Sequence, residues 1–349
     1  MTIDVPDGAK MAEPAHRIGV LGAGSWGTAL AALAARRGHD VCLWAREPEV
    51  VRQIREGGEN QCFLPGVELP RELNATGEME GAVAGAEIVM SVSPAQYAGT
   101  VVGRAAPFLE SDAVVVSASK GIEIATLRRM DEVMSELLTP RQGARLTVLS
   151  GPSFAAEVVR GQPTAVVAAS RSEEARLLVQ TALQGPSFRV YTNDDVIGVE
   201  LGGALKNVIA LAAGVVAGHG FGHNTLCALI TRGLAEITRL GVAMGARPPT
   251  FFGLAGMGDL VLTCTGHVSR NRTVGFELGR GRTLDDILGG MTAVAEGVKT
   301  AEAVHELAAR YRVEMPICDQ VYDILMGRTD PAEAANNLMM RDPKPEHWS

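Results

Sequence analysis

The segment Arg17-Ile18-Gly19-Val20-Leu21-Gly22-Ala23-Gly24-Ser25-Trp26-Gly27-Thr28-Ala29-Leu30 decides the fold of this chain. It predicts an apolar strand that runs into the motif Gly22-x-Gly24-x-x-Gly27 and then into a helix rich in alanine and leucine. Gly22 permits a tight turn, Gly24 lets the backbone approach a pyrophosphate, and Gly27 lets the helix pack closely on the strand. The helix N-terminus then points free N–H groups and its positive dipole end at the phosphates. The segment therefore predicts a dinucleotide-binding site; the alternative is a glycine-rich turn without a ligand.

The overall composition is ordinary for a globular protein and offers no surface for nucleic acid. A chain of 349 residues is long enough for two domains and a sizeable core. Apolar residues make up 46% and charged residues 21%, both close to average. The formal net charge of −8 gives no basic patch of the kind that binds a phosphate backbone. We therefore expect a small-molecule partner and no nucleic acid.

The cysteine and histidine residues show no metal-binding pattern. The cysteines form no CxxC motif and no Cys/His spacing typical of zinc, and the histidines contain no HExxH motif. The five cysteines are Cys42, Cys62, Cys227, Cys264 and Cys318. An odd number without a pattern is typical of a reducing compartment. The sequence predicts no structural metal and a cytoplasmic location.

Neither the N-terminus nor the longest apolar stretch predicts export or membrane insertion. Residues 1–16 are polar and acidic and lack the apolar region of a signal peptide, so we expect a flexible tail. The apolar stretch 196–218 contains Glu200 and Lys206, and a charge at mid-bilayer costs about 3 kcal/mol. We therefore expect a buried helix of a soluble protein.

Strand and helix patterns alternate along the first part of the chain. We expect strands at 18–21, 40–44, 88–92, 113–117, 146–149, 164–169 and 188–191. Among the helical runs between them are 28–37, 48–56 and 173–183. This alternation predicts right-handed βαβ units and a doubly wound parallel sheet of the Rossmann type.

The pattern becomes almost entirely helical near Asp194. Long helices are expected at 199–217 and 224–244, with shorter ones as far as Leu338. The sequence therefore predicts an α/β fold in three parts, namely a flexible tail over 1–16, a dinucleotide-binding domain over 17–194, and an all-helical substrate and dimerisation domain over 195–349.

The end of the second strand bears on the choice of cofactor. An NAD-selective site places Asp or Glu about twenty residues past the glycines, on the ribose 2′-hydroxyl. Here the strand ends at Arg46, with Glu47 next. A guanidinium is a good partner for a 2′-phosphate. We therefore favour NADPH, with NADH tolerated; the alternative for Arg46 is a solvated loop cation.

Two lysines stand in apolar surroundings. Lys120 follows the strand 113–117, and the carboxyl ends of such strands face the ligand crevice of a parallel sheet. Lys206 and Asn207 interrupt the apolar run 201–210, so the lysine must either reach water along its aliphatic chain or serve a site. Partial burial would lower its pKa toward a range useful for acid–base catalysis.

A third cluster lies in the helical part. Asp259 follows glycines that allow close backbone approach. The run Ser269-Arg270-Asn271-Arg272 combines hydroxyl, guanidinium and amide donors suited to a phosphate. A capped helix start on the surface is the alternative.

Together these segments resemble bacterial NAD(P)-dependent glycerol-3-phosphate dehydrogenases over about residues 17–330. The resemblance is carried, in chain order, by Gly22-Ala23-Gly24-Ser25-Trp26-Gly27-Thr28-Ala29, Ser119-Lys120-Gly121, Ser150-Gly151-Pro152-Ser153-Phe154-Ala155, Gly202-Gly203-Ala204-Leu205-Lys206-Asn207-Val208, Leu229-Ile230-Thr231-Arg232-Gly233, Gly258-Asp259-Leu260-Val261-Leu262-Thr263-Cys264-Thr265, Ser269-Arg270-Asn271-Arg272 and Glu296-Gly297. Such a series is far more specific than the glycine motif alone.

The resemblance implies the reversible reduction of dihydroxyacetone phosphate to sn-glycerol 3-phosphate, the backbone of phospholipids. It implies that Lys206 accepts a proton in the oxidative direction and donates one to the C2 alkoxide in the reductive direction. Lys120 and Asp259 complete the implied catalytic group. Two lysines near C2 would stabilise the negative charge that hydride delivery builds on the ketone oxygen. The sequence leaves open whether Asp259 orients Lys206 or binds a substrate hydroxyl.

Matching positions also imply the binding residues. Those implied for the substrate are Lys120, Gly151, Ser153, Lys206, Asp259, Ser269, Arg270 and Asn271. Those expected for the cofactor, with the three glycines of the motif, are Gly22, Gly24, Ser25, Trp26, Gly27, Arg46, Tyr97, Lys120, Ala155, Arg270, Val294 and Glu296. The apolar helical half and the resemblance predict a homodimer.

Two other functions stay open. A dehydrogenase of the same two-domain plan that acts on a β-hydroxy acid would need a cationic site without the full Ser-Arg-Asn-Arg cluster. A nucleotide-binding protein that had lost catalysis would keep the fold, although the intact Lys206 and Asp259 argue against it.

Overall fold

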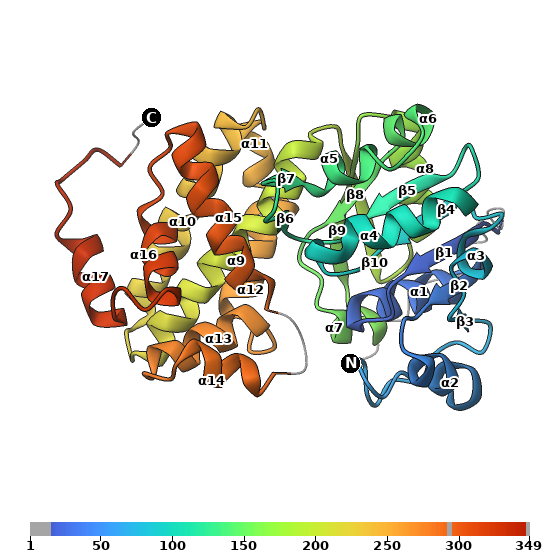
Figure 1. Ribbon diagram of the computed structural model, residues 1–349, viewed down its shortest axis with the longest axis horizontal. Helices are drawn as coiled ribbons and strands as arrows, with labels where there is room; N and C mark the ends of the chain where they lie inside the picture. Colours follow the sequence, from blue (N-terminus) through green and yellow to red (C-terminus); the bar gives the residue numbers. More distant parts are fainter. Residues whose placement is uncertain (1–14, 292–294, 347–349) are drawn as a thin grey trace.

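The computed structural model describes residues 15–291 and 295–346. One half of the molecule is a β-sheet covered by helices, and the other half is built from helices (Figure 1). Of the predicted tail, only Ala15 and His16 lie within the described residues. His16 is attached to the sheet half, because its backbone N–H donates to Nδ1 of His39 over 3.1 Å.

The main sheet has eight strands in the order β10-β9-β8-β5-β4-β1-β2-β3. They are β1 (Arg17–Leu21), β2 (Asp40–Trp44), β3 (Asn74–Thr76), β4 (Ile88–Ser91), β5 (Val114–Ser117), β8 (Thr147–Ser150), β9 (Thr164–Ser170) and β10 (Phe188–Asn193). Strand β1 lies between β2 and β4, so the chain reverses its direction of progress across the sheet there. Ligands of such sheets bind at this switch point, beyond the carboxyl ends of the strands. The α/β fold of the Rossmann type is therefore confirmed.

Helices cover both faces of this sheet, as its alternating buried residues require. Along β4, Ile88 and Met90 belong to one apolar cluster and Val89 to another. The helices of this half are α1 (Ser25–Arg36), α2 (Pro48–Gly57), α3 (Met79–Val83), α4 (Ala95–Ala105), α5 (Met130–Ser135), α6 (Pro140–Ala144), α7 (Ala155–Val159) and α8 (Glu173–Leu183), with a short 3-10 turn at Ala106–Phe108. Parallel strands buried on both faces read as continuous apolar runs, which is why the sequence identified them.

One pair departs from the parallel sheet that the sequence predicts. Strands β8 and β9 are antiparallel, whereas β9 and β10 are parallel to each other. The chain between β8 and β9 contains only the five-residue helix α7. The sequence also gave no sign of the small hairpin formed by β6 (Ile122–Glu123) and β7 (Arg128–Arg129).

The helical half is organised around one long helix, α9 (Val196–Gly218), which is buried along most of its length. The other helices of this half are α10 (His223–Ala243), α11 (Pro248–Phe251), a π-helical turn (Leu254–Gly258), α12 (Asp259–Thr265), α13 (Arg270–Gly279), α14 (Leu284–Gly289), α15 (Glu296–Tyr311), α16 (Pro316–Leu325) and α17 (Pro331–Met339). Helices α9 and α13 touch through their backbones, since a Cβ added at Gly275 would stand 1.9 Å from the carbonyl oxygen of Leu211. Helix α9 is long and apolar enough to cross a bilayer, yet 83% of its most apolar window is buried in the protein.

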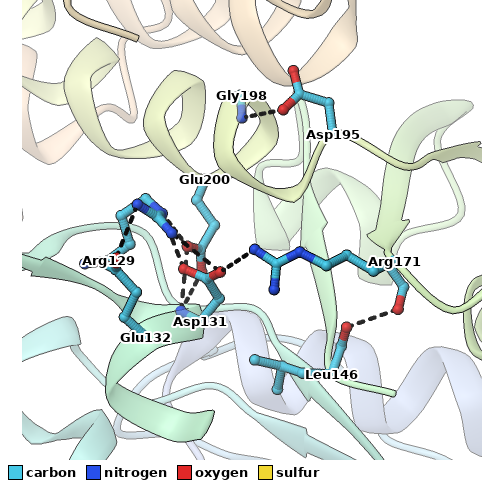
Figure 2. Close-up of polar contacts among 9 residues, drawn as sticks. Arg129, Asp131, Glu132, Leu146, Arg171, Asp195, Gly198 and Glu200 are labelled. Atoms are coloured by element: carbon cyan, nitrogen blue, oxygen red, sulfur yellow. Dashed lines mark hydrogen bonds and ion pairs between the residues drawn. The ribbon is translucent and has the colours of Figure 1, made fainter. Parts of the chain in front are cut away.

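A buried ionic cluster joins α9 to the sheet half (Figure 2). Both carboxylate oxygens of Glu200 accept the backbone N–H of Asp131, at 3.0 and 3.3 Å. Arg129 donates from Nε to Oδ1 of Asp131 at 3.0 Å and lies 3.7 Å from Oε2 of Glu200. Burial, and then the nearby Asp131 carboxylate, raise the pKa of Glu200 well above its ordinary value. Two buried carboxyl groups thus share one buried guanidinium, which favours a proton on Glu200.

We expect Glu200→Gln to match the parent's free energy of unfolding within about 0.5 kcal/mol at low pH, where the carboxyl group is neutral in both the folded and the unfolded chain. At pH 7 the variant should be more stable than the parent, because its amide cannot ionise in the unfolded chain. Folding raises the pKa of Glu200 above its ordinary value of 4.5. At pH values above 4.5 the folded chain therefore binds more protons than the unfolded chain. Its contribution to stability is therefore lost as the pH rises through the folded pKa. Urea unfolding across that range would show a smaller loss in the variant. A loss of several kcal/mol at pH 7 would mean instead that Glu200 is an ionised partner of Arg129.

Candidate active site

The loop after β1 has the shape that a dinucleotide pyrophosphate needs. Gly22 adopts φ +118°, and a Cβ at Gly27 would stand 1.8 Å from the carbonyl oxygen of Gly22. A Cβ at Gly24 would meet nothing within 4 Å, so this glycine faces open space. Helix α1 begins at Ser25 with no side-chain cap on its first N–H groups. The three glycines therefore differ as expected, and the uncapped helix end fits an anion.

The two residues after Gly24 differ in what their side chains can offer a ligand. The hydroxyl of Ser25 donates to the carbonyl oxygen of Phe63 over 2.6 Å, which ties the helix start to a neighbouring loop. The indole Nε1 of Trp26 is buried and has no hydrogen-bond partner among the described residues. An orphaned buried donor at this helix end fits a site that a ligand completes.

Three further residues predicted for the cofactor follow β2 or lie in α4 and α7. Arg46 follows β2, and its side chain is 75% exposed and paired with Glu47. Tyr97 is exposed in the first turn of α4, and Ala155 is the first residue of α7. Val294 lies outside the described residues.

Glu296 reaches the sheet half from the start of α15. Its Oε1 accepts the backbone N–H of Ala95, at the start of α4, over 2.9 Å. Burial raises the pKa of Glu296, and the positive charges of Arg270, Lys206 and Lys120 oppose that rise. The carboxylate thus joins the two halves beside the lysines.

The structure brings Lys120, Lys206 and Asp259 together. Nζ of Lys206 donates to Oδ1 of Asp259 at 2.6 Å, and Nζ of Lys120 donates to Oδ2 at 2.7 Å. The side chains of Lys206 and Asp259 are 8% and 2% exposed, and that of Lys120 is 17% exposed. Lys206 therefore does not extend to the surface, and Asp259 already has an ammonium group on each oxygen.

Each member of this triad comes from a different element. Lys120 follows β5, Lys206 lies in the middle of α9, and Asp259 begins α12 just after the π-helical turn. Lys120 also donates to the carbonyl oxygen of Gly151 at 3.0 Å, and the Ser153 hydroxyl donates to the same oxygen at 3.0 Å. The loop after β8 thus holds one lysine in place from the sheet side.

The charges and the burial of Lys120, Lys206 and Asp259 bring the pKa of Lys206 closer to neutral pH. The pKa of Lys206 is lowered to about 8, chiefly by burial; the Asp259 carboxylate opposes this shift, and the nearby Lys120 adds to it. Burial alone would raise the pKa of Asp259, but the two ammonium groups hold it below its usual value. An ionised carboxylate between two ammonium groups leaves one net positive charge in a water-poor site. Such a site can stabilise a developing oxyanion and supply a proton.

One neighbour of Lys206 was assigned no role from the sequence. The hydroxyl oxygen of Thr263 accepts from Nζ of Lys206 over 2.6 Å, and it donates to the backbone carbonyl of Asp259 over 2.6 Å. Thr263 follows Asp259 by four residues on α12, which places both on one face of the helix. This spacing was visible in the sequence. An ammonium group has three N–H bonds, so Lys206 keeps one for a ligand.

The residues predicted to hold a phosphate gather at the start of α13, but they are not equally available. Ser269 is the N-cap, and its hydroxyl accepts the N–H of Arg272. Arg270 is exposed. The Asn271 side chain donates to Oδ1 of Asn207 at 2.9 Å and accepts from the N–H of Gly297 at 2.9 Å. The helix end and Arg270 therefore present their donors outward, while Asn271 keeps only its second amide N–H.

Within residues 15–291 and 295–346, no group of three His, Cys, Asp or Glu side chains could hold a metal ion.

Comparison with known proteins identifies the group to which this arrangement belongs. The family described as NAD-dependent glycerol-3-phosphate dehydrogenase matches with its N-terminal part over residues 17–176 and with its C-terminal part over residues 195–336. The chain is 56% identical to a glycerol-3-phosphate dehydrogenase [NAD(P)+] of Geobacter sulfurreducens, over 95% of this chain and 99% of that one. It is 55% identical to the protein of that name from Citrifermentans bemidjiense, with the same coverage.

A solved structure agrees with these matches. The crystal structure of glycerol-3-phosphate dehydrogenase from Coxiella burnetii is 38% identical and covers 94% of this chain and 99% of its own, with a TM-score of 0.88. The matched regions include the glycine loop, both lysines and Asp259. The chain belongs to the NAD-dependent glycerol-3-phosphate dehydrogenase family.

Proposed function

We propose that this protein catalyses the reversible reduction of dihydroxyacetone phosphate to sn-glycerol 3-phosphate with NADPH or NADH. The observation that carries the proposal is the convergence of Lys120 and Lys206 on the buried carboxylate of Asp259. The names of the bacterial relatives agree with this substrate and with use of either cofactor. The product would supply the glycerol backbone for phospholipid synthesis.

Lys206, Lys120 and Asp259 have different roles in the proposed reaction. A bound nicotinamide supplies the hydride for C2 of the substrate. Lys206 donates a proton to the C2 oxygen in the reductive direction and accepts it in the oxidative direction. Lys120 stabilises the negative charge on that oxygen, and Asp259 orients both ammonium groups. Asp259 is therefore a positioning residue, since both of its oxygens are already engaged by lysines.

The same arrangement indicates where cofactor and substrate lie. The glycine loop and the uncapped start of α1 would hold the pyrophosphate, with Trp26 and Glu296 beside it. The N-terminal end of α13, with Ser269, Arg270 and the remaining N–H of Asn271, would hold the substrate phosphate. Gly151 and Ser153 would border the substrate from the sheet side through their contacts with Lys120.

Other parts of the proposal concern the protein as a whole. We place the boundary between a dinucleotide-binding domain (17–194) and a helical domain (195–349) between β10 and α9, which end and begin at Asn193 and Val196. We further propose a cytoplasmic homodimer that does not insert into membranes. The burial of α9 within the protein supports the last point. Sedimentation of the purified protein tests the dimer.

A steady-state assay tests the activity directly. Purified protein with dihydroxyacetone phosphate should oxidise NADPH and NADH, and sn-glycerol 3-phosphate should drive the reverse reaction. Turnover with a β-hydroxy acid and none with dihydroxyacetone phosphate would contradict the proposal. Absence of turnover together with tight NADPH binding would indicate a nucleotide-binding protein instead.

Arg270→Ala is expected to raise the KM for dihydroxyacetone phosphate by about tenfold to a hundredfold, because a hydrogen bond from a charged donor contributes about 1.5–3 kcal/mol. Turnover with saturating substrate should change much less. Arg280→Ala is the matched control, since Arg280 is an exposed arginine at the opposite end of α13. Equal effects of the two substitutions would remove Arg270 from the phosphate site.

A further inference from the structure

Two adjacent residues of opposite charge, Arg46 and Glu47, follow the end of β2 and form an ion pair. Nε and Nη2 of Arg46 both donate to Oε1 of Glu47, at 2.9 and 2.6 Å. The side chains are 75% and 36% exposed, so a ligand can reach both. The second carboxylate oxygen of Glu47, Oε2, accepts no hydrogen bond from the described residues.

The backbone fixes this pair next to the cofactor loop. The N–H of Gly22 donates to the carbonyl oxygen of Trp44 over 3.1 Å, and Arg46 follows Trp44 by two residues. In folds of this kind the end of the second strand lies beside the adenosine ribose. A carboxylate at this place accepts the ribose 2′-hydroxyl of NAD, whereas a guanidinium accommodates the 2′-phosphate of NADP. This chain has both a guanidinium (Arg46) and a carboxylate (Glu47) at this place, and the two are hydrogen-bonded to each other.

We propose that Glu47 determines the cofactor preference of the enzyme by competing with the 2′-phosphate for Arg46. With NADH, Oε1 keeps the guanidinium in place and Oε2 accepts the ribose 2′-hydroxyl. With NADPH, the guanidinium turns from Glu47 to the phosphate, and Glu47 becomes a like charge beside it. The inference rests on the proposed function, because it assigns the ribose of the cofactor to this end of the sheet.

The strength of the pair explains why either cofactor can bind. An ion pair between exposed side chains is weak, because water screens it and two long side chains must be ordered. A 2′-phosphate carries more charge than a carboxylate and can accept two N–H bonds from a guanidinium. It can therefore displace Glu47 at a small cost. That cost falls only on NADPH, and the hydrogen bond to Oε2 is made only by NADH, so the carboxylate shifts the preference toward NADH.

The local fold does not depend on the Glu47 side chain, which makes the proposal testable by substitution. Glu47 is the N-cap residue of α2, but its side chain makes no capping hydrogen bond. The cap contact is made by its backbone carbonyl, which accepts the N–H of Val50 at 3.1 Å. Pro48 at the first helical position fixes the helix start independently. Replacing the carboxylate by an amide should therefore leave the fold intact.

The test compares kcat/KM for NADPH and NADH in Glu47→Gln, with dihydroxyacetone phosphate at saturation. We expect kcat/KM to rise about threefold to fivefold for NADPH, since Arg46 loses its competitor. For NADH it should fall by a similar factor, because a neutral amide oxygen accepts the 2′-hydroxyl less strongly than a carboxylate. The ratio of the two values should thus rise about tenfold, while kcat with each cofactor stays near that of the parent.

Two further variants separate the possible outcomes. Glu49→Gln removes an equal charge two residues away, from a carboxylate that pairs with Arg52 instead, and it should leave the ratio unchanged. Arg46→Ala should weaken NADPH far more than NADH. If Arg46→Ala acts in this way but Glu47→Gln leaves the ratio unchanged, the role of Glu47 is overturned while the proposed cofactor site stands. If Glu49→Gln shifts the ratio as much as Glu47→Gln, a general charge effect replaces the proposal. If Arg46→Ala affects both cofactors equally, the 2′-phosphate contact itself is wrong.

Discussion

Lys206→Ala is expected to lower kcat for the reduction of dihydroxyacetone phosphate by two or more orders of magnitude, the usual effect of losing a positioned acid. In the structure the Lys206 ammonium is buried, donates to Asp259 and Thr263, and keeps one N–H bond for the substrate. The side chain does not contact the glycine loop in the described contacts, so the affinity for NADPH should stay nearly unchanged. Fluorescence titration with NADPH and stopped-flow turnover measure the two quantities separately.

The pH dependence of the same reaction gives an independent check on Lys206. Its pKa is lowered to about 8, so the reductive kcat should fall as the pH rises above that value and the proton donor is lost. The oxidative rate should rise over the same range. Lys206→Arg keeps the charge but holds its proton too tightly, and it should be nearly as slow as the alanine variant. Lys299→Ala, at an exposed lysine of α15, should behave like the parent. Near-normal turnover in Lys206→Ala would remove the residue from its role.

Asp259→Asn is expected to have the largest effect on stability, because it leaves the buried Lys206 ammonium and the partly buried Lys120 ammonium without their counter-charge. Removing one partner of a buried ion pair costs about 3–5 kcal/mol of the free energy of unfolding. The neutral amide would also depress the pKa of Lys206, since the Asp259 carboxylate is the largest influence that raises it. The variant should therefore lose both stability and turnover at pH 7.

The pH dependence of this loss identifies its cause. In Asp259→Asn the folded Lys206 releases its proton more readily than it does in the unfolded chain, so the unfolded chain binds more protons and stability rises with pH. Urea unfolding at pH 7 and pH 9.5 should show the deficit shrinking at the higher pH. Asp285→Asn, an exposed aspartate in the first turn of α14, should show no deficit at either pH. A deficit that stayed constant with pH would indicate lost packing instead of stranded charge.

The sheet half was predictable because its signals are local. Strand β2 and helix α8 have the expected bounds, and the glycine motif marks the β1–α1 turn by its own spacing. Helix α1 begins at Ser25, three residues before the expected start. Gly24 occupies its N-cap position without any side-chain hydrogen bond to the first turn. The antiparallel β8–β9 pair was not predictable from strand patterns alone, since an apolar strand looks the same in either direction.

The site was only partly predictable, because its contacts join residues far apart in the chain. Lys206 was identifiable as a charge inside an apolar helix, but its partner Asp259 lies 53 residues away. The sequence therefore left two roles open for Asp259, and only the fold shows one carboxylate between two ammonium groups. The Glu200–Asp131 contact was not anticipated for the same reason, since it spans 69 residues.

A crystal structure with both NADP+ and sn-glycerol 3-phosphate bound tests the arrangement of the amines most directly. We predict that Nζ of Lys206 lies within about 3.2 Å of the C2 oxygen, with Nζ of Lys120 on its other side and Asp259 still between the two. A ternary complex in which the C2 carbon faces the nicotinamide while both amines point away from its oxygen would contradict the account.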